Sequence, residues 1–140
     1  KGWDLILSAP SAKREKTVQS LIQLSGIQYC MDNNFDFTFE PNEGPGPADI
    51  KISRGAKDKT IIEVKLNTNP DYLHGYEEQL ETYAKAERTE KCIYVYVKVE
   101  KHPERDKKIQ QLHAKKKSSG EIAPYLYIID AQRKLSASRK

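Results

Sequence analysis

The segment TIIEVKL, residues 60–66, decides the fold of this chain, because it has the composition of a central β-strand. Its β-branched and apolar residues favour a pleated surface that is buried by neighbouring elements. Successive side chains of a strand point to opposite faces. Glu63 and Lys65 are therefore predicted to share one face, while Ile62 and Val64 point the other way into a core.

Two further strands are predicted before this segment. FDFTFE, residues 35–40, and ADIKIS, residues 48–53, alternate apolar and polar side chains, which is the period of a half-buried strand. Turn-forming residues dominate NEGPGP, residues 42–47, and a second turn is expected at residues 54–59. These short connections favour an antiparallel meander of three strands.

The other predicted elements alternate between helix and strand. Apolar spacing and breaker residues indicate helices at residues 11–25, 71–88 and 104–116 and strands at residues 92–99 and 124–130. Gly26 is expected to end the first helix. The order α-β-β-β-α-β-α-β predicts an α/β fold with a mixed β-sheet and helices on both faces.

The chain has 140 residues, the usual size of one domain. It begins at Lys1 and its only methionine is Met31, so we expect a domain excised from a larger protein with other domains. The polar residues 131–140 are expected to form a flexible tail.

Several classes of protein are disfavoured by composition. No apolar run approaches the length of a membrane span, and no signal peptide is visible, so no membrane association is expected. Cys30 and Cys92 form no C-x-x-C pair, which indicates reduced thiols in a cytoplasmic protein and argues against a cysteine zinc site.

The net charge is +4, and the C-terminal half carries most of the excess. This balance suits a nucleic-acid partner, although a solvated helix face would look the same. Four tyrosines alternate along the later strands, where a core or partner-surface role is favoured over stacking on bases. They are Tyr94, Tyr96, Tyr125 and Tyr127.

Two acids and a lysine are predicted to meet on one face of the sheet. Asp49 and Lys51 share a face of their strand, and pairing with the next strand would bring Asp49 towards Glu63. Two carboxylates repel each other unless a cation lies between them, and Mg²⁺ accepts carboxylate and phosphate oxygens together. With Lys65 beside them, these residues indicate phosphodiester hydrolysis. The alternative is an ordinary salt-bridge network, since Glu-x-Lys is common in strands.

The second predicted helix supplies two more candidates. Gln79 and Tyr83 are four residues apart and therefore lie on the same helix face, next to the buried stripe. An amide and a phenol there could hold a phosphate or an attacking water. Taken alone, Tyr83 is better explained as a core aromatic with a hydrogen-bonded tip.

Together these residues carry a resemblance to a known family. GPGPADIKI at residues 44–52, IIEVK at residues 61–65 and QLETY at residues 79–83 resemble the motifs of the PD-(D/E)XK nuclease superfamily, in the branch with a Q-x-x-x-Y motif. The pattern is also similar to bacterial restriction- and phage-defence-associated domains. The resemblance covers residues 11–130 and implies a restriction endonuclease-like α-β-β-β-α-β core. One departure is Ala48, where many members have proline.

The resemblance implies a role for each matching residue. Asp49 and Glu63 would bind the metal, the main-chain carbonyl of Val64 would complete the site, and Lys65 would position or activate the attacking water. Family members often add an acid from the first helix, for which Glu15 is the candidate. Glu15 could equally be a surface acid between two basic neighbours.

The same resemblance implies that Gln79 and Tyr83 support the phosphate or the nucleophile. Basic side chains outside the centre are candidates for contacts with nucleic acid, although a capping or surface role is favoured for the histidine among them. These candidates are Lys51, Arg54, Lys57, His74, Lys115, Lys116 and Lys117.

The sequence therefore predicts a Mg²⁺- or Mn²⁺-dependent deoxyribonuclease. Double-stranded DNA is the favoured substrate, an endonuclease is favoured over an exonuclease, and a homodimer stays open because members of the superfamily often dimerise. Two alternatives remain. One is a catalytically inactive module of the same fold that binds nucleic acid or protein, and the other is an unrelated α/β interaction domain whose acids and lysines pair on the surface.

Overall fold

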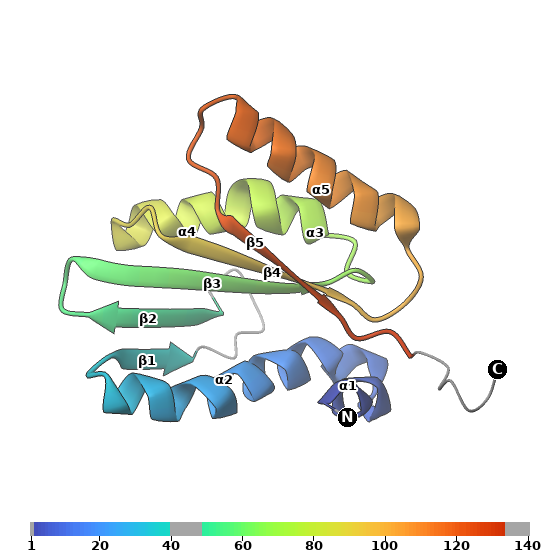
Figure 1. Cartoon of the computed structure of the whole chain (residues 1–140), viewed down its shortest axis with the longest axis horizontal. Coiled ribbons are helices and arrows are strands. Elements are labelled where there is room, and N and C mark those ends of the chain that lie inside the picture. The colour runs from blue at the N-terminus through green and yellow to red at the C-terminus, as the bar shows by residue number, and fades with distance from the viewer. Residues whose placement is uncertain (1, 40–48, 134–140) are drawn as a thin grey trace.

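The computed structural model describes residues 2–39 and 49–133, which build a five-stranded mixed sheet between two layers of helices (Figure 1). The strand order in the sheet is the order in the sequence, from β1 to β5. This arrangement confirms the predicted α/β class with a mixed sheet and helices on both faces.

The first half of the sheet is the predicted antiparallel meander. It consists of β1 (Asp36–Phe39), β2 (Ile50–Arg54) and β3 (Asp58–Leu66). The second half is parallel, with β4 (Cys92–Lys98) beside β3 and β5 (Tyr125–Asp130) at the edge. β3 therefore has a partner on each side, as its apolar composition predicts.

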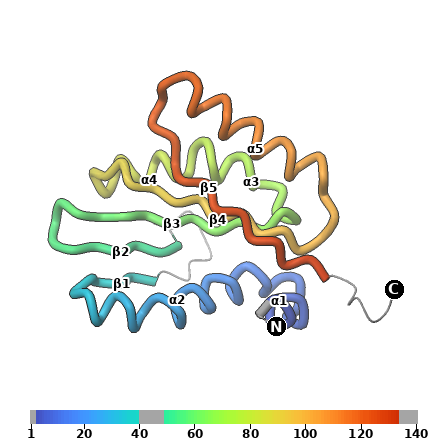
Figure 2. Tube along the Cα trace, in the orientation of Figure 1, coloured from blue at the N-terminus to red at the C-terminus, as the bar shows by residue number. Residues whose placement is uncertain are grey.

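The helices form two layers, visible in the trace of Figure 2 as segments below and above the sheet. One layer contains α1 (Gly2–Ser8), the 3-10 turn Ser11–Lys13 and α2 (Arg14–Asp32). The other layer contains a continuous helical stretch, formed in sequence by α3 (Tyr72–His74), a π-helical segment (Gly75–Gln79) and α4 (Leu80–Glu87), followed after β4 by α5 (Pro103–Ser118).

Each face of the sheet has its own core. The core under α1 and α2 is aliphatic and includes Ile50, Ile62, Val64 and Val97. The core under α3, α4 and α5 is rich in aromatic rings: Tyr72, Tyr76, Tyr94 and Tyr96 are all buried there. Even-numbered residues of β3 serve the first core and odd-numbered residues face the second, so Glu63 and Lys65 lie on the side of α3 and α4.

Two predictions about the first helical region are wrong. The helix at the N-terminus, α1, was not predicted, and α2 continues beyond residue 25 to Asp32. Gly26 does not stop α2, because it serves close packing: a Cβ there would lie 3.3 Å from the ring of Phe37. The helix ends instead at Asn33 and Asn34, the second of which has a positive φ of 58°.

The ordered chain continues past β5 into the first residues of the expected tail. Ala131 is buried, and its N–H donates to the carbonyl oxygen of Lys98 at 2.9 Å. Gln132 Nε2 donates to the carbonyl oxygen of Glu100 at 2.6 Å. The predicted loop at residues 42–47 and the rest of the tail, residues 134–140, lie outside the described residues.

Candidate active site

Asp49 and Glu63 lie together where β2 begins. The register pairs Ile50 with Ile62, so one further step along the same antiparallel pair sets Asp49 opposite Glu63. The side chains also interlock through the main chain: Val64 N–H donates to Asp49 Oδ2 at 2.8 Å, and Asp49 N–H donates to the Glu63 carboxylate. The structure thus brings the two predicted acids together.

The environment of this pair disfavours two negative charges. Burial raises the pKa of the Glu63 carboxyl to about 8, and the neighbouring Asp49 charge is the next cause. Burial also raises the pKa of Asp49 to about 6, against the opposing effect of the Val64 N–H. Removing carboxylates from water costs free energy that two hydrogen bonds recover only in part. Only 3% of Glu63 is exposed.

Lys65 provides a cation beside the pair. Its Nζ lies 3.5 Å from Glu63 Oε1. Burial works to lower the pKa of Lys65, but the negative charges of Glu63, Glu15 and Asp49 outweigh burial and raise this pKa above its ordinary value. Lys65 therefore carries a positive charge at neutral pH and acts as a fixed cation and hydrogen-bond donor.

Gly75, the first residue of the π-helical segment, leaves the space that Lys65 occupies beneath the helix layer. A Cβ built on Gly75 would lie 3.0 Å from Lys65 Cε and 3.3 Å from the hydroxyl of Tyr94. Only glycine leaves that space open. π-helical turns are rare and occur frequently at functional sites. Residues 71–88, predicted as one regular helix, thus contain a local widening directly above the candidate site.

Gln79 ends the π-helical segment and Tyr83 lies one turn later in α4. Gln79 Oε1 is buried and has no hydrogen-bond partner among the described residues. Burial raises the pKa of the Tyr83 hydroxyl, and the Glu63 charge adds to this, so the phenol stays protonated and can donate. Tyr83 therefore lies near Glu63, Lys65 and Asp49, and Gln79 lies one turn before it with a buried, unpartnered oxygen among the described residues; both side chains are half-buried.

α2 contributes two side chains from the opposite layer. Glu15 Oε2 accepts a hydrogen bond from Asn69 Nδ2 at 3.1 Å, and its charge acts on both Asp49 and Lys65. Gln19, which is buried, hydrogen-bonds to the Asp49 carboxylate and helps to lower its pKa. Gln19 was not predicted, although it lies one turn after Glu15 and next to buried Val18, a spacing that could have identified it.

The donor set suits a hard divalent cation in part. Glu63 Oε2 is buried without a hydrogen-bond partner among the described residues, and Mg²⁺ prefers such carboxylate oxygens. Across residues 2–39 and 49–133, however, no group of three or more His, Cys, Asp or Glu side chains is placed to share one metal ion. An ion here would need oxygen ligands from the main chain, water or substrate besides the two acids.

The other basic candidates for contacts with nucleic acid have different surroundings. Lys51 extends towards Glu87 in α4. Arg54 contacts the connection between α2 and β1: its Nη2 donates to the Asn33 carbonyl oxygen at 2.5 Å, and its guanidinium lies over the Phe35 ring. Lys57 is exposed in the β2–β3 turn. His74 is exposed and lies 3.3 Å from the Glu78 carboxylate.

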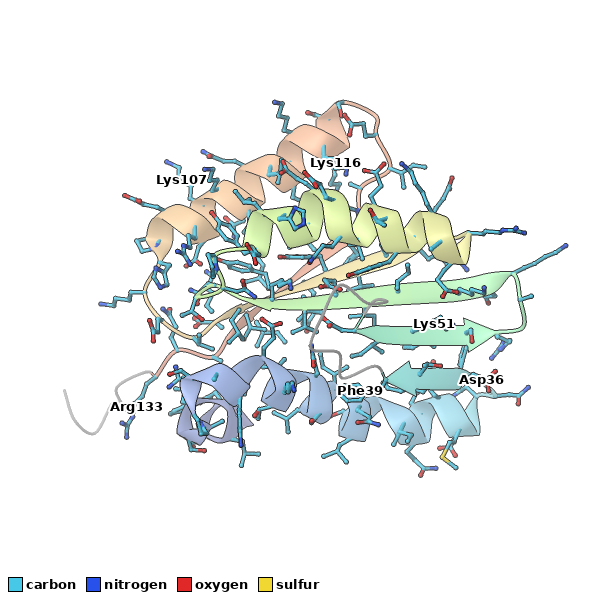
Figure 3. The ribbon with its side chains drawn as sticks, turned by 180° about the vertical axis from the view of Figure 1, so that it is seen from behind. Asp36, Phe39, Lys51, Lys107, Lys116 and Arg133 are labelled. Carbon is cyan, nitrogen blue, oxygen red and sulfur yellow. The ribbon has the colours of Figure 1, made fainter. Side chains whose placement is uncertain are left out.

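The basic cluster Lys115, Lys116 and Lys117 lies in the last turn of α5. Lys115 and Lys117 are exposed, while Lys116 extends over the ring of Tyr76. Figure 3 shows Lys107 and Lys116 along α5, well apart from Lys51 on β2.

The strand tyrosines divide into two groups. Tyr94 and Tyr96 are buried, which confirms the core interpretation for them. Tyr125 and Tyr127 are exposed on edge strand β5, with stacked rings whose centroids are 6.4 Å apart.

The fold and the site define an α/β protein with a buried acid pair and a lysine on one face of a mixed sheet. A family model described as "Domain of unknown function (DUF8371)" matches residues 1–101, well over half of the chain, and the chain belongs to this family. The matched residues include Asp49, Glu63, Lys65, Gln79 and Tyr83. No curated protein and no solved structure matches the chain. Within the part of the chain that the structure describes, no helix has both the length and the apolarity to cross a bilayer.

Proposed function

We propose that this domain is a metal-dependent nuclease with a restriction endonuclease-like core, similar to the PD-(D/E)XK superfamily. The observation that carries the proposal is the convergence of Asp49 and Glu63 at opposed positions of β2 and β3, with Lys65 3.5 Å from Glu63. Asp49, Glu63 with Lys65, and Tyr83 come from three successive segments of the chain, and an isolated Glu-x-Lys strand would not account for this grouping.

The raised pKa values of the two carboxyls indicate that the protein alone does not supply enough positive charge to balance two carboxylates here. Structural ion pairs usually lower the pKa of an acid, whereas burial and mutual repulsion raise it here. A divalent cation would relieve the repulsion and use the buried, unpartnered Glu63 Oε2. Asp49, Glu63 and the main-chain carbonyl of Val64 would hold it, with Glu15 as a further candidate from α2.

When bound, Mg²⁺ or Mn²⁺ would supply a Lewis acid and an acidified water for attack on phosphorus. The chain's own residues do the positioning. Lys65 presents a positive charge next to the acids, where it would orient the attacking water and offset charge on the phosphate oxygens. Tyr83 would donate from its protonated hydroxyl, and the amide of Gln79 would accept from the water or donate to phosphate. DNA, in double-stranded form, is the favoured substrate.

The experiment is incubation with plasmid and single-stranded DNA in the presence of Mg²⁺, Mn²⁺ or EDTA. We expect cleavage with either metal and none in EDTA, and linear or nicked plasmid would indicate endonuclease action. Asp49→Ala, Glu63→Ala and Lys65→Ala should each abolish cleavage while the circular dichroism spectrum stays that of a folded domain. Cleavage at the wild-type rate by a folded Glu63→Ala variant would remove the proposal.

One observation favours a second candidate, the catalytically inactive binding module of the same fold. It is the lack, within the described residues, of a third acidic or histidine ligand placed with Asp49 and Glu63. That candidate predicts DNA binding that falls with salt, with no product in any metal. The same plasmid assay, paired with a binding titration, separates the two functions.

A further inference from the structure

Two lysines from neighbouring strands converge on one glutamate near the candidate site. Lys59 Nζ lies 3.1 Å from Glu87 Oε2, and Lys51 Nζ lies 3.4 Å from Glu87 Oε1. The side chains are about a quarter to a third exposed, so a ligand from solvent can reach them. Among the described residues, no other acid is paired with either lysine.

The cluster is aligned with the candidate active site. Lys51 is paired with Ile61 in the sheet, and Lys59 is two residues before Ile61 in β3. Both lysines therefore lie on the same face of the sheet as Glu63. Lys59 is four residues before Glu63, which is about 13 Å along a strand. Glu87 follows Tyr83 by four residues and Gln79 by eight, so all three lie along one face of the helix. The lysines and the two acids thus lie on one face of the sheet, beside the helix face that carries Tyr83 and Glu87.

The charges in this cluster do not balance. Two ammonium groups share one carboxylate, which leaves one net positive charge in a partly buried position. The lysines hold the pKa of Glu87 below its usual range, chiefly through the hydrogen bond from Lys59, so the carboxylate is ionised. An oxyanion bridged by two amines is also how a phosphate diester would be held, and lysine is a regular phosphate ligand.

We propose that Lys51 and Lys59 form a binding site for a backbone phosphate of the nucleic acid, beside the phosphate to be cleaved. Without nucleic acid, the Glu87 carboxylate occupies the position between the two amines, and the incoming phosphate competes with it. This site rests on the proposed function, because it assumes that a nucleic-acid strand bound at the acids continues past Lys51 and Lys59. It assigns a role to Lys59 and Glu87, and it predicts opposite effects of removing the lysines and the acid.

The test is a fluorescence-anisotropy titration of a short DNA duplex in EDTA at a series of KCl concentrations. The Lys51→Gln/Lys59→Gln variant should lose about one unit of the slope of log K against log salt and bind roughly tenfold more weakly near physiological salt. The control is Lys85→Gln/Lys107→Gln, which removes the same charge from exposed positions on α4 and α5. The control should keep the wild-type slope.

Glu87→Gln provides the second arm. Removing the competing carboxylate should tighten DNA binding, by several-fold on the scale expected for one like charge near the phosphate. Equal slopes for the two double-lysine variants, or weaker binding by Glu87→Gln, would overturn the phosphate site. Lys51→Gln and Lys59→Gln are also measured singly, so the result does not depend on the folding of the double variant.

These titrations are independent of cleavage, because EDTA removes the metal. Binding that depends on Lys51 and Lys59, with no product in Mg²⁺ or Mn²⁺, would keep the phosphate site and remove the nuclease. Cleavage by a Lys51→Gln/Lys59→Gln variant with an unchanged salt slope would keep the nuclease and remove the phosphate site. A wild-type domain that binds no DNA would remove both.

Discussion

Glu63 in β3 and Asn67 just after it are both buried polar residues, but their surroundings differ completely. Asn67 is 0% exposed, and its amide is fully used: Oδ1 accepts from Val99 N–H at 3.0 Å and Nδ2 donates to the Glu100 carbonyl oxygen at 2.8 Å. Its own carbonyl oxygen accepts from Arg105 at 2.9 Å. Glu63, in contrast, has one buried oxygen with no partner among the described residues.

The difference separates a structural polar group from a functional one. A satisfied amide such as Asn67 fixes the ends of β3 and β4 relative to each other and stabilises the fold. An acid with a raised pKa and an unused oxygen destabilises the fold in the absence of a ligand. Residues kept at such a cost usually serve binding or catalysis.

The largest expected effect is a loss of cleavage on conversion of Glu63 to its neutral isostere. Glu63→Gln should lower the cleavage rate on the order of 10³-fold, because a metal ligand and a negative charge are lost together. The same change should raise the apparent melting temperature at pH 8, because it removes a buried charge. Rates from plasmid cleavage and melting curves from circular dichroism check the two effects. A variant that is both less active and less stable would place Glu63 with Asn67 as a structural residue.

Asn67→Ala should produce the opposite pattern. It leaves the N–H of Val99 without its side-chain acceptor and removes one of the two side-chain donors to the carbonyl oxygen of Glu100, so we expect a loss of about 2–4 kcal/mol in the free energy of unfolding. Urea denaturation measures it. Cleavage per folded molecule should stay within a few-fold of wild type. An unchanged free energy of unfolding in Asn67→Ala would contradict the structural role assigned to Asn67.

The pH dependence of stability gives the third test. The folded-state pKa of Glu63 is about 8, above the ordinary value of 4.5, so the folded protein holds the proton more tightly than the unfolded chain does. The contribution of Glu63 to stability is therefore greatest below its unfolded pKa and is lost as the pH rises towards its folded pKa. Over pH 6 to 7.5 the stability should fall with a slope that approaches the limit for one proton, on the order of 1 kcal/mol per pH unit. Urea denaturation of the metal-free domain in EDTA measures it.

Glu63→Gln is the control for this slope, since the variant has no carboxyl to titrate at that position. It should be flat over the same range apart from the smaller contribution of Asp49, whose pKa is about 6. A wild-type slope of zero would show that water or neighbouring positive charges stabilise the Glu63 carboxylate, and it would weaken the contrast with Asn67.

The smallest expected effect concerns the position of Lys65. Gly75→Ala puts a methyl group 3.0 Å from Lys65 Cε, so the lysine must shift away from the helix. We expect roughly a tenfold lower rate of cleavage from misplacement of this kind, with DNA affinity in EDTA unchanged. Glu77→Ala, at an exposed position of the same π-helical segment, is the matched control. Equal rates for the two variants would contradict a positioning role for Gly75.

Much of the site could be predicted because it depends on local periodicity. Alternation along residues 60–66 places Glu63 and Lys65 on one face, and helical spacing places Gln79 and Tyr83 together. The meander of β1, β2 and β3 follows from short connections between alternating segments. These rules act over a few residues, and the structure agrees with them.

The features that the sequence did not predict depend on contacts between distant segments. Glycine is typical of a helix C-terminus, but Gly26 lies inside α2, where it packs against the ring of Phe37. The π-helical segment was not predicted, and its first residue, Gly75, lies against Lys65, which belongs to a different element. The convergence of Lys51 and Lys59 on Glu87 likewise requires that α4 lie against the sheet.

The most direct test is isothermal titration calorimetry of the metal-free domain with Mn²⁺ at pH 7.5, in two buffers with different ionisation enthalpies. Wild-type protein should bind with proton release, which the two buffers reveal as different apparent enthalpies, because Glu63 must lose its proton to become a ligand. Asp49→Asn and Glu63→Gln should abolish this heat. Absence of binding by the wild-type protein, or equal binding by the folded Glu63→Gln variant, would contradict a metal site at these two acids.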